Sequence, residues 1–419
     1  KSLKILKNVT DFKVIKYKSG QQCYDWKIPL VWRIKDAYIK SDNKRVIDFK
    51  ANNLHVVNYS HPIKKKISFN SLKKKLHYIE NFPKAIPYRT SYYEKDWGFC
   101  ISYNDFLKLD KKSEFDVLID SKFEDGYMHC GEFLKRGSSK KEFIFSSYFC
   151  HPSMANDNLS GMIAWILLLK YIKELKTKFS YRFIIIPETI GSIAYLFNNE
   201  KKLSDTLGGF VLTCMSGPGR TGYKKTFLEN HKLDDICINV LKNEFKNLKI
   251  YPFDVFGSDE RQYSSPHFRI PISTITKDKY FDYEYYHTSL DNLNFAKPEN
   301  LHKIFNSYLK VIENIEKTDS SEFVIKKNKL KKNTFKSVYK CEPMLSKRKL
   351  YPKLGGANFQ KKTSNSKSLS KPIMWTLFFA DGSTSVDQII KKSRLPRLDI
   401  IKAIKILKKN KLIIDQDGK

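Results

Sequence analysis

Residues 146–165 read SSYFCHPSMANDNLSGMIAW, and this stretch joins a predicted strand to a predicted helix. The apolar run that ends at His151 has the length and composition of a buried strand. Ser160-Gly161 then opens an apolar helix, and Asp157 lies six residues after His151. The sequence therefore places an imidazole and a carboxylate on one loop at the carboxyl end of a strand, where open α/β sheets bind their ligands.

The alternation of strand and helix continues on both sides of this loop. Apolar runs of strand length occupy residues 115–120, 142–149, 181–188 and 208–215. Helical patterns occupy residues 159–175, 233–247 and 298–317, the last with Pro298 at its start. Because the predicted strands are almost continuously hydrophobic, the pattern predicts an α/β fold with a mostly parallel sheet covered by helices on both faces.

The flanking sequence differs from this α/β pattern and indicates further domains. Residues 24–60 contain short β-prone pieces separated by turn residues, which favours a small antiparallel unit. Near the carboxyl end, a helix, a turn, a Ser/Thr-capped helix, a break at Pro396, an amphipathic helix and a short strand predict a winged helix. We therefore divide the chain into the α/β domain (residues 1–25 and 116–320), an inserted β-rich domain (26–115), a linker (321–369) and a winged helix-turn-helix (370–419).

Composition limits the classes of protein and of partner. The 419 residues carry a formal net charge of +33, but lysine is spread over every segment, which favours compositional bias over a nucleic-acid surface as its cause. The seven cysteines are scattered without a CxxC pair, as expected for buried thiols of a cytoplasmic protein. No apolar run approaches the about 20 residues of a membrane span, and residues 1–30 lack a signal-peptide core. We expect a cytoplasmic protein without a membrane partner.

Groups that can bind metal recur after predicted strands and on nearby loops. His151, Glu188 and Cys214 each follow a strand, so the fold would bring them to one edge of the sheet. Two later loops add Asp259, Glu260, His287 and Asp291. Two histidines, an aspartate and an unliganded glutamate are what a zinc hydrolase requires, since the metal binds nitrogen and oxygen ligands and a carboxylate accepts the proton of its water.

Each of these residues also has a purely structural interpretation. His151 can be a hydrogen-bonded loop histidine, and Asp157 can cap the helix that follows it. Glu188, after Pro187, can cap the helix that contains IGSIAYLF. From the residues alone, the metal site and these structural roles both stay open.

Four longer motifs narrow the choice: HPSMANDNLSG, IPETIGS, GSDERQY and EYYHTSLDN. Together with YDWKIPLVWRIKDAYI in the amino-terminal third and the winged helix, they resemble the polysaccharide-biosynthesis proteins with an aminopeptidase-like domain. These proteins are distant relatives of the zinc aminopeptidases that bind two metal ions. The resemblance covers most of the chain, and it implies a zinc-exopeptidase-like α/β domain.

The resemblance also implies roles for individual residues. His151 matches the first metal-binding histidine, Asp157 the aspartate that bridges two zinc ions, and His287 the last histidine ligand. Glu188 matches the general base.

Two departures reduce the implied ligand set. Thr189 stands where the second glutamate would bind metal, and Cys214 where an aspartate ligand is expected. We therefore expect one zinc held by His151, Asp157 and His287, with two zinc ions as the alternative. Additional candidates for binding metal or substrate are Asp259, Glu260, Arg261, Cys214 and Tyr286.

Two functions follow from this interpretation. The first is a zinc-dependent amide hydrolase of aminopeptidase type, acting on a peptide or an acylated amino-sugar or amino-acid intermediate, in line with the family's link to surface-polysaccharide synthesis. The second is an inactive scaffold that binds protein or, as a weaker alternative, DNA through its winged helix. For that helix, Lys402, Lys405, Lys408 and Lys409 can equally form an ordinary solvated face.

Overall fold

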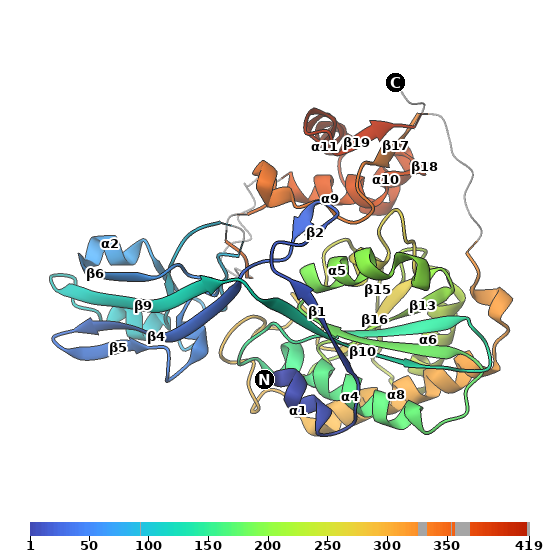
Figure 1. Cartoon of the computed structure of the whole chain (residues 1–419), viewed down its shortest axis with the longest axis horizontal. Helices are drawn as coiled ribbons and strands as arrows, with labels where there is room; N and C mark the ends of the chain where they lie inside the picture. The colour runs from blue at the N-terminus through green and yellow to red at the C-terminus, as the bar shows by residue number, and fades with distance from the viewer. Residues whose placement is uncertain (93, 326–332, 353, 357–368, 417–419) are drawn as a thin grey trace.

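A mixed sheet, eight-stranded within the described residues, is the centre of the computed structural model, which describes residues 1–92, 94–325, 333–352, 354–356 and 369–416 (Figure 1). Its strands, in spatial order, are β1 (Lys13–Lys18), β10 (Tyr127–Lys135), β12 (Ser180–Ile186), β11 (Glu142–Tyr148), β13 (Thr206–Val211), β16 (Ile272–Lys277), β14 (Thr221–Lys224) and β15 (Lys249–Tyr251). The central strands β12, β11, β13 and β16 are parallel, as expected, whereas β10 and β14 run antiparallel to their inner neighbours.

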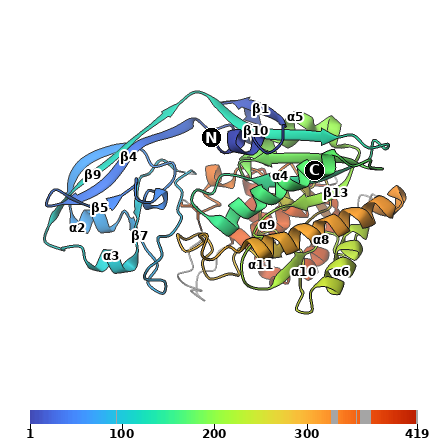
Figure 2. The same ribbon diagram turned by 90° about the horizontal axis from the view of Figure 1, so that it is seen from below.

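Helices cover both faces of this sheet. One face packs against α4 (Gly161–Lys173), α6 (Lys232–Glu244) and α8 (Pro298–Lys317), and Figure 2, seen from below, shows α4 and α8 in front of the sheet. The other face packs against α5 (Ile190–Asn199). All residues of β11 and β12 are buried, which explains why the central strands are almost continuously hydrophobic. The fold class expected from the sequence is confirmed, and α8 has the bounds expected for it.

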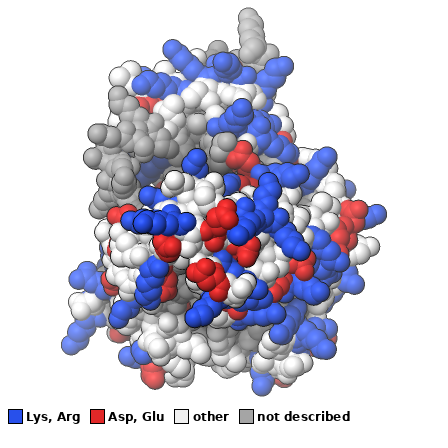
Figure 3. Space-filling model, turned by 90° about the vertical axis from the view of Figure 1, so that its left-hand side faces the viewer, with Lys and Arg blue, Asp and Glu red and all other residues white. Residues whose placement is uncertain are grey.

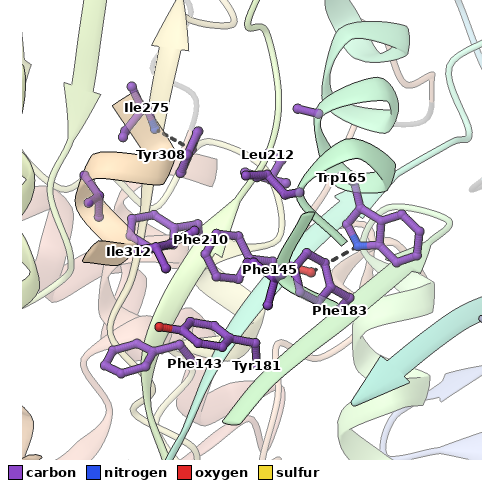
Figure 4. Close-up of a cluster of buried hydrophobic side chains, with 14 of the residues drawn as sticks. Phe143, Phe145, Trp165, Tyr181, Phe183, Phe210, Leu212, Ile275, Tyr308 and Ile312 are labelled. Atoms are coloured by element: carbon purple, nitrogen blue, oxygen red, sulfur yellow. Dashed lines mark hydrogen bonds between the residues drawn. The ribbon is translucent and has the colours of Figure 1, made fainter. Parts of the chain in front are cut away.

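Aromatic side chains fix α4 and α8 on the sheet (Figure 4). Phe145 stacks on Phe183 with ring centroids 5.2 Å apart, and Tyr308 of α8 meets Phe210 edge-on. Trp165 of α4 donates its indole N–H to the carbonyl of Phe145 at 3.2 Å. The first turn of α4, which follows the loop with His151 and Asp157, is therefore held against the central strands.

Gly161 is required at that first turn. A Cβ atom there would lie 2.2 Å from the carbonyl oxygen of Leu212, which follows β13. Only glycine lets the start of α4 approach the sheet this closely.

The inserted domain is a separate antiparallel sheet that projects from the α/β domain (Figure 1). Its strands are β5 (Lys44–Asp48), β4 (Val31–Ser41), β9 (Glu114–Glu124) and β6 (Ile63–Ser68), flanked by α2 (Phe69–Lys73) and α3 (Tyr103–Leu107). Residues 115–120, expected in the large sheet, instead belong to β9. In β9 buried and exposed residues alternate, the pattern of a strand with one solvated face. The inserted domain thus extends beyond the limit at residue 115 that we expected.

Short elements complete the first two domains. They are α1 (Ser2–Lys7), α7 (Glu260–Tyr263), β2 (Gln22–Cys23), β3 (Trp26–Lys27), β7 (Leu76–His77) and β8 (Phe99–Cys100). Lysine and arginine are interspersed with acidic residues over the end of the molecule that the inserted domain forms (Figure 3). On this face the positive charge is dispersed, as compositional bias would produce.

The carboxy-terminal domain has the expected winged-helix elements. They are β17 (Thr334–Ser337), α9 (Ser370–Phe378), β18 (Asp381–Ser385), α10 (Val386–Ser393), α11 (Arg397–Lys409) and β19 (Ile413–Asp415). Strand β17 lies inside the segment expected as a linker, but it pairs with both β18 and β19, so the domain begins before residue 370. Residues 326–332 and 357–368 of that segment lie outside the described residues.

The winged helix is docked on the α/β domain. Helix α9 packs against Phe227, Phe253 and Val255, and half-buried Arg269 pairs with Asp381 at 2.5 Å. This docking leaves α11 on the outer side of the domain (Figure 1). None of the helices in the described residues combines the length and the hydropathy of a membrane span.

Candidate metal centre

The loop after β11 is held by buried polar groups. Asp291 accepts the backbone N–H groups of Asn156 and Asp157 on its two carboxylate oxygens, at 2.6 and 2.9 Å. The side-chain oxygen of Asn156 in turn accepts the backbone N–H groups of Ser216 and Gly217. These bonds replace a regular helical start, and α4 begins only after Ser160. Asp157 makes no capping bond to α4, so its carboxylate is available for another partner.

That carboxylate meets two imidazoles. The ligand atoms of His151, Asp157 and His287 all lie within 4.8 Å of one another, and His287 Nε2 is 3.0 Å from Asp157 Oδ2. The three side chains are only 6%, 1% and 9% exposed, in the same order. Ligands of a tetrahedral zinc, with bonds of about 2.1 Å, stand about 3.4 Å apart. The three residues therefore offer donor chemistry that suits one zinc ion, and they lie close enough together to reach a common cation.

Neighbouring groups orient the three donors. The Tyr148 hydroxyl donates to Asp157 Oδ1 at 2.6 Å, which turns Oδ2 towards His287. The ring of Tyr286 stacks on His287 with centroids 3.9 Å apart. Contacts of this kind fix the orientation of metal ligands before the metal arrives.

The environment keeps Asp157 and His287 in the charge states that metal binding uses, whereas a metal ion would have to displace a proton from His151. Burial alone would raise the pKa of Asp157, but His151 and His287 beside it lower the pKa to about 2. Burial lowers the pKa of His287. Burial also disfavours the charged form of His151, but the negative charge of Asp157 and the contact with Cys150 outweigh it and raise the pKa of His151. A bound cation would take over the role of that proton as the partner of Asp157.

Glu188 lies beside these donors. Its Oε2 is 3.8 Å from His151 Nε2, and its Oε1 accepts the Ser258 hydroxyl at 2.6 Å. Burial raises the pKa of Glu188, with His151 opposing that shift. A carboxylate at this position, with a raised pKa, suits proton transfer.

Cys150 is a site residue that the sequence analysis missed. Its sulfur accepts the backbone N–H of Glu188 at 3.2 Å and lies 3.5 Å from His151 Nδ1. Cys150, His151 and Glu188 form a second group of donors within 4.8 Å. A partner at Nδ1 leaves Nε2 of His151 for the metal. Its position next to His151 in the sequence is the feature that could have identified it. The contact of Ser258 with Glu188, by contrast, joins residues far apart in the sequence and could not be found in this way.

The additional candidate residues from the sequence differ in whether they contact the metal donors or the cavity. Cys214 is buried with Tyr280, Tyr283 and Tyr286, and it joins neither donor group found among the described residues. Glu260 is also buried, where Thr274, Tyr280 and Lys224 bond its Oε1.

Thr189, the residue after Glu188, is hydrogen-bonded to Asp259. Asp259 Oδ1 accepts the Thr189 N–H at 2.7 Å and the Ser192 hydroxyl at 2.8 Å. Asp259 likewise belongs to neither donor group among the described residues. Arg261, by contrast, pairs with Glu342 at 2.7 Å and lines the cavity above the metal centre.

A cavity of about 380 Å³ opens over the centre. His151, Glu188 and His287 line it, and so does Arg261. Its lining also includes many aromatic residues, namely Trp26, Tyr59, Tyr88, Tyr92, Phe256, Phe281, Tyr286 and Tyr351. Gly355 contributes from the segment that leads to the winged helix, where it pairs with Thr90 of the inserted domain. All three domains or their connections therefore shape this cavity.

Comparison with known proteins gives the wider context. The sequence matches the family described as Domain of unknown function (DUF4910) over residues 1–318, and the winged helix-turn-helix family over residues 333–415. A relative from Clostridium acetobutylicum, named for polysaccharide biosynthesis and an aminopeptidase-like domain, is 38% identical over 394 residues, which cover 94% of this chain and 86% of that protein. The resemblance drawn from the motifs is confirmed.

Solved structures support the same relationship and identify the fold of the α/β domain. A structure of a candidate peptidase from Clostridium acetobutylicum aligns with a TM-score of 0.73 at 35% identity, over 99% of this chain and 90% of that one. BSAP, a zinc aminopeptidase from Bacillus subtilis, aligns with a TM-score of 0.53 at 14% identity, over 77% of this chain and 90% of that one. The α/β domain therefore has the fold of a zinc aminopeptidase.

Asp259 makes stability depend on pH in a direction that can be measured. Burial, followed by the charge of Glu188, raises the pKa of Asp259 to about 7 from 3.8. Because the folded state then holds a proton that the unfolded state releases, the stabilisation is present below about pH 4 and is lost as the pH rises to about 7.

We expect Asp259→Asn to remove this loss in metal-free protein. The amide oxygen still accepts the Thr189 and Ser192 donors, and no charge is buried. At pH 8 the variant should be more stable than the wild type by about 2–4 kcal/mol in urea unfolding, with a smaller difference at pH 5. Asp42→Asn, at an exposed position, is the matched control. A wild type whose stability rises between pH 5 and pH 8 relative to Asp259→Asn would contradict the buried, protonated carboxyl.

Proposed function

Because the chain belongs to the DUF4910 family, whose α/β domain here has a zinc-aminopeptidase fold, we propose that it is a zinc-dependent amide hydrolase. The observation that carries this proposal is the buried group of His151, Asp157 and His287 with Glu188 beside it. Three protein ligands and an adjacent free carboxylate are the composition of a catalytic zinc site, whereas a structural zinc site has four protein ligands.

The residues divide the chemistry between them. A zinc ion held by His151, Asp157 and His287 would lower the pKa of water and polarise the amide carbonyl. Glu188 takes a proton from the attacking water and returns it to the leaving nitrogen, and its raised pKa suits both transfers. The water oxygen bonds to the acyl carbon, the C–N bond breaks, and the products are a carboxylate and an amine. One zinc is the number that these three ligands support.

The substrate class follows from the relative and from the cavity. The Clostridium acetobutylicum relative is named for polysaccharide biosynthesis, which favours an acylated amino-sugar or amino-acid-bearing precursor of a surface polysaccharide. Aromatic residues on the cavity wall suit sugar rings, and Arg261 adds a cation. A peptide remains the other amide that this site could hydrolyse.

We expect Glu188→Gln to lower hydrolysis at least about 100-fold while zinc stays bound, because the amide cannot accept the proton of water. The assay follows release of p-nitroaniline from its N-acetyl, N-octanoyl and L-leucyl derivatives by the zinc-loaded full chain. Zinc content is measured on the same samples. Glu284→Gln, at an exposed glutamate, controls for the loss of one charge. Unchanged turnover in Glu188→Gln would remove Glu188 from the role of base.

A second candidate function rests on the surface of the winged helix. Lys402, Lys405 and Lys409 are exposed on α11, which faces away from the α/β domain. In winged helices this third helix is the one that enters the major groove of DNA. We propose nucleic-acid binding here as the alternative to enzymatic function, with the α/β domain as a scaffold.

Salt dependence tests this alternative. If α11 contacts phosphates, retention of the full chain on duplex DNA should fall steeply between 50 and about 200 mM salt. Lys402→Glu with Lys405→Glu should weaken retention and flatten the salt dependence by about one unit of slope per lost contact. Lys64→Glu with Lys65→Glu, on the inserted domain, is the matched control. Equal losses in the two double variants would show that binding follows net charge and not α11.

A further inference from the structure

The candidate metal centre lies between two cavities. The first is the aromatic cavity described above, and the second, of about 640 Å³, adjoins it along the same loop. Asn58, Tyr59, Cys150 and His151 line both of them. A substrate whose reacting carbonyl meets the metal beside His151 can therefore extend in both directions.

The second cavity, here called the outer cavity, is apolar. Charged residues make up 29% of the sequence, yet none of the described residues that line the outer cavity is Lys, Arg, Asp or Glu. Six large apolar side chains line it, namely Trp32, Phe149, Met154, Leu159, Met162 and Leu293, and the polar residues of its lining are uncharged Ser and Asn side chains and His151.

Two of these side chains are unusually exposed. Leu293 is 75% exposed, the highest value among the described large hydrophobic residues, and Leu159 is 40% exposed. Both lie on the wall of this cavity. Exposed apolar side chains gathered beside a reaction centre indicate that an apolar group covers them during function.

The carboxylates beside the centre give a second constraint. A substrate with a free α-amino group needs an anion to pair with its ammonium ion near the scissile bond. Among the described residues, the linings of the two cavities contain a single carboxylate, Glu188, which the proposed function uses as the base. Asp259 and Glu260 line neither cavity; Oδ1 of Asp259 and Oε1 of Glu260 accept bonds from other protein groups.

We propose that the outer cavity binds the uncharged, apolar acyl group of the substrate, so that the enzyme is a deacylase of N-acylated amines and not an aminopeptidase. The inference rests on the proposed function. The acyl group leaves as a carboxylate, and the amine leaves from the aromatic cavity, where Arg261 and the ring side chains contact it. The acyl chain packs on Leu159, Met162 and Leu293.

Three zinc-binding probes test this assignment on the zinc-loaded full chain by calorimetry. Acetohydroxamate carries one methyl group, octanohydroxamate extends it by six methylenes, and L-leucine hydroxamate has an apolar side chain beside an ammonium ion. We expect octanohydroxamate to bind at least about tenfold more tightly than acetohydroxamate, because the added methylenes are buried in the outer cavity. It should also bind more tightly than L-leucine hydroxamate.

Variants of the outer cavity test where the octanoyl chain of the probe binds. Leu159→Glu with Leu293→Glu should abolish the gain in affinity of octanohydroxamate over acetohydroxamate measured on the same variant, and both positions are exposed enough for the fold to tolerate the change. Leu107→Glu, at a leucine of the inserted domain that is 60% exposed, is the control and should have no effect.

The outcomes distinguish a failure of the deacylase assignment from a failure of the proposed zinc-dependent hydrolase. Tighter binding of L-leucine hydroxamate than of octanohydroxamate, or a chain-length gain that survives in the double variant, would overturn the deacylase assignment alone. If none of the probes binds in a zinc-dependent way, the proposed function itself fails.

Discussion

The carboxylate of Asp291 holds the loop on which the candidate centre depends. It accepts the N–H groups of Asn156 and Asp157 in the irregular turn before α4, where Asp157 and Asn158 have non-helical backbone angles. Asp157 is thereby turned towards His287 instead of capping α4. Since α4 is fixed by Trp165 and by the close approach of Gly161 to Leu212, the aromatic core positions the chemistry as well as stabilising the fold.

The centre departs from a two-metal site in ways that have physical consequences. Cys214, at the position expected for a second aspartate ligand, packs in a cluster of tyrosines. Thr189, at the position expected for a second glutamate, donates its backbone N–H to Asp259. The remaining donors around Asp157 suit a single ion. Cys150 contacts both His151 and the backbone N–H of Glu188, and these contacts help to fix the positions of the two residues. A substrate cleft that extends to both sides of His151 then favours an acylated substrate over a free amine.

The sequence predicted the elements whose signals are local. The apolar helix that became α4, the Pro298 start of α8 and the capped helices of the winged helix all follow from short-range patterns. Residues 115–120 were assigned to the wrong sheet because strand length and hydrophobicity do not identify the partner strand. The segment around β17 read as a linker because its pairing with β18 and β19 joins distant residues. The motifs led to His151, Asp157 and His287, whereas the contacts of Tyr148, Ser258 and Cys150 with them arise only from tertiary structure.

The central claim is that His151, Asp157 and His287 hold one zinc ion. Zinc K-edge X-ray absorption on the full chain, loaded with zinc and freed of excess metal, tests it most directly. The account requires about one zinc per chain in a shell of nitrogen and oxygen that includes two imidazoles, with the shell lost in His151→Ala. A sulfur neighbour at about 2.3 Å would instead make Cys150 a ligand, and a protein that retains no zinc would contradict the claim altogether.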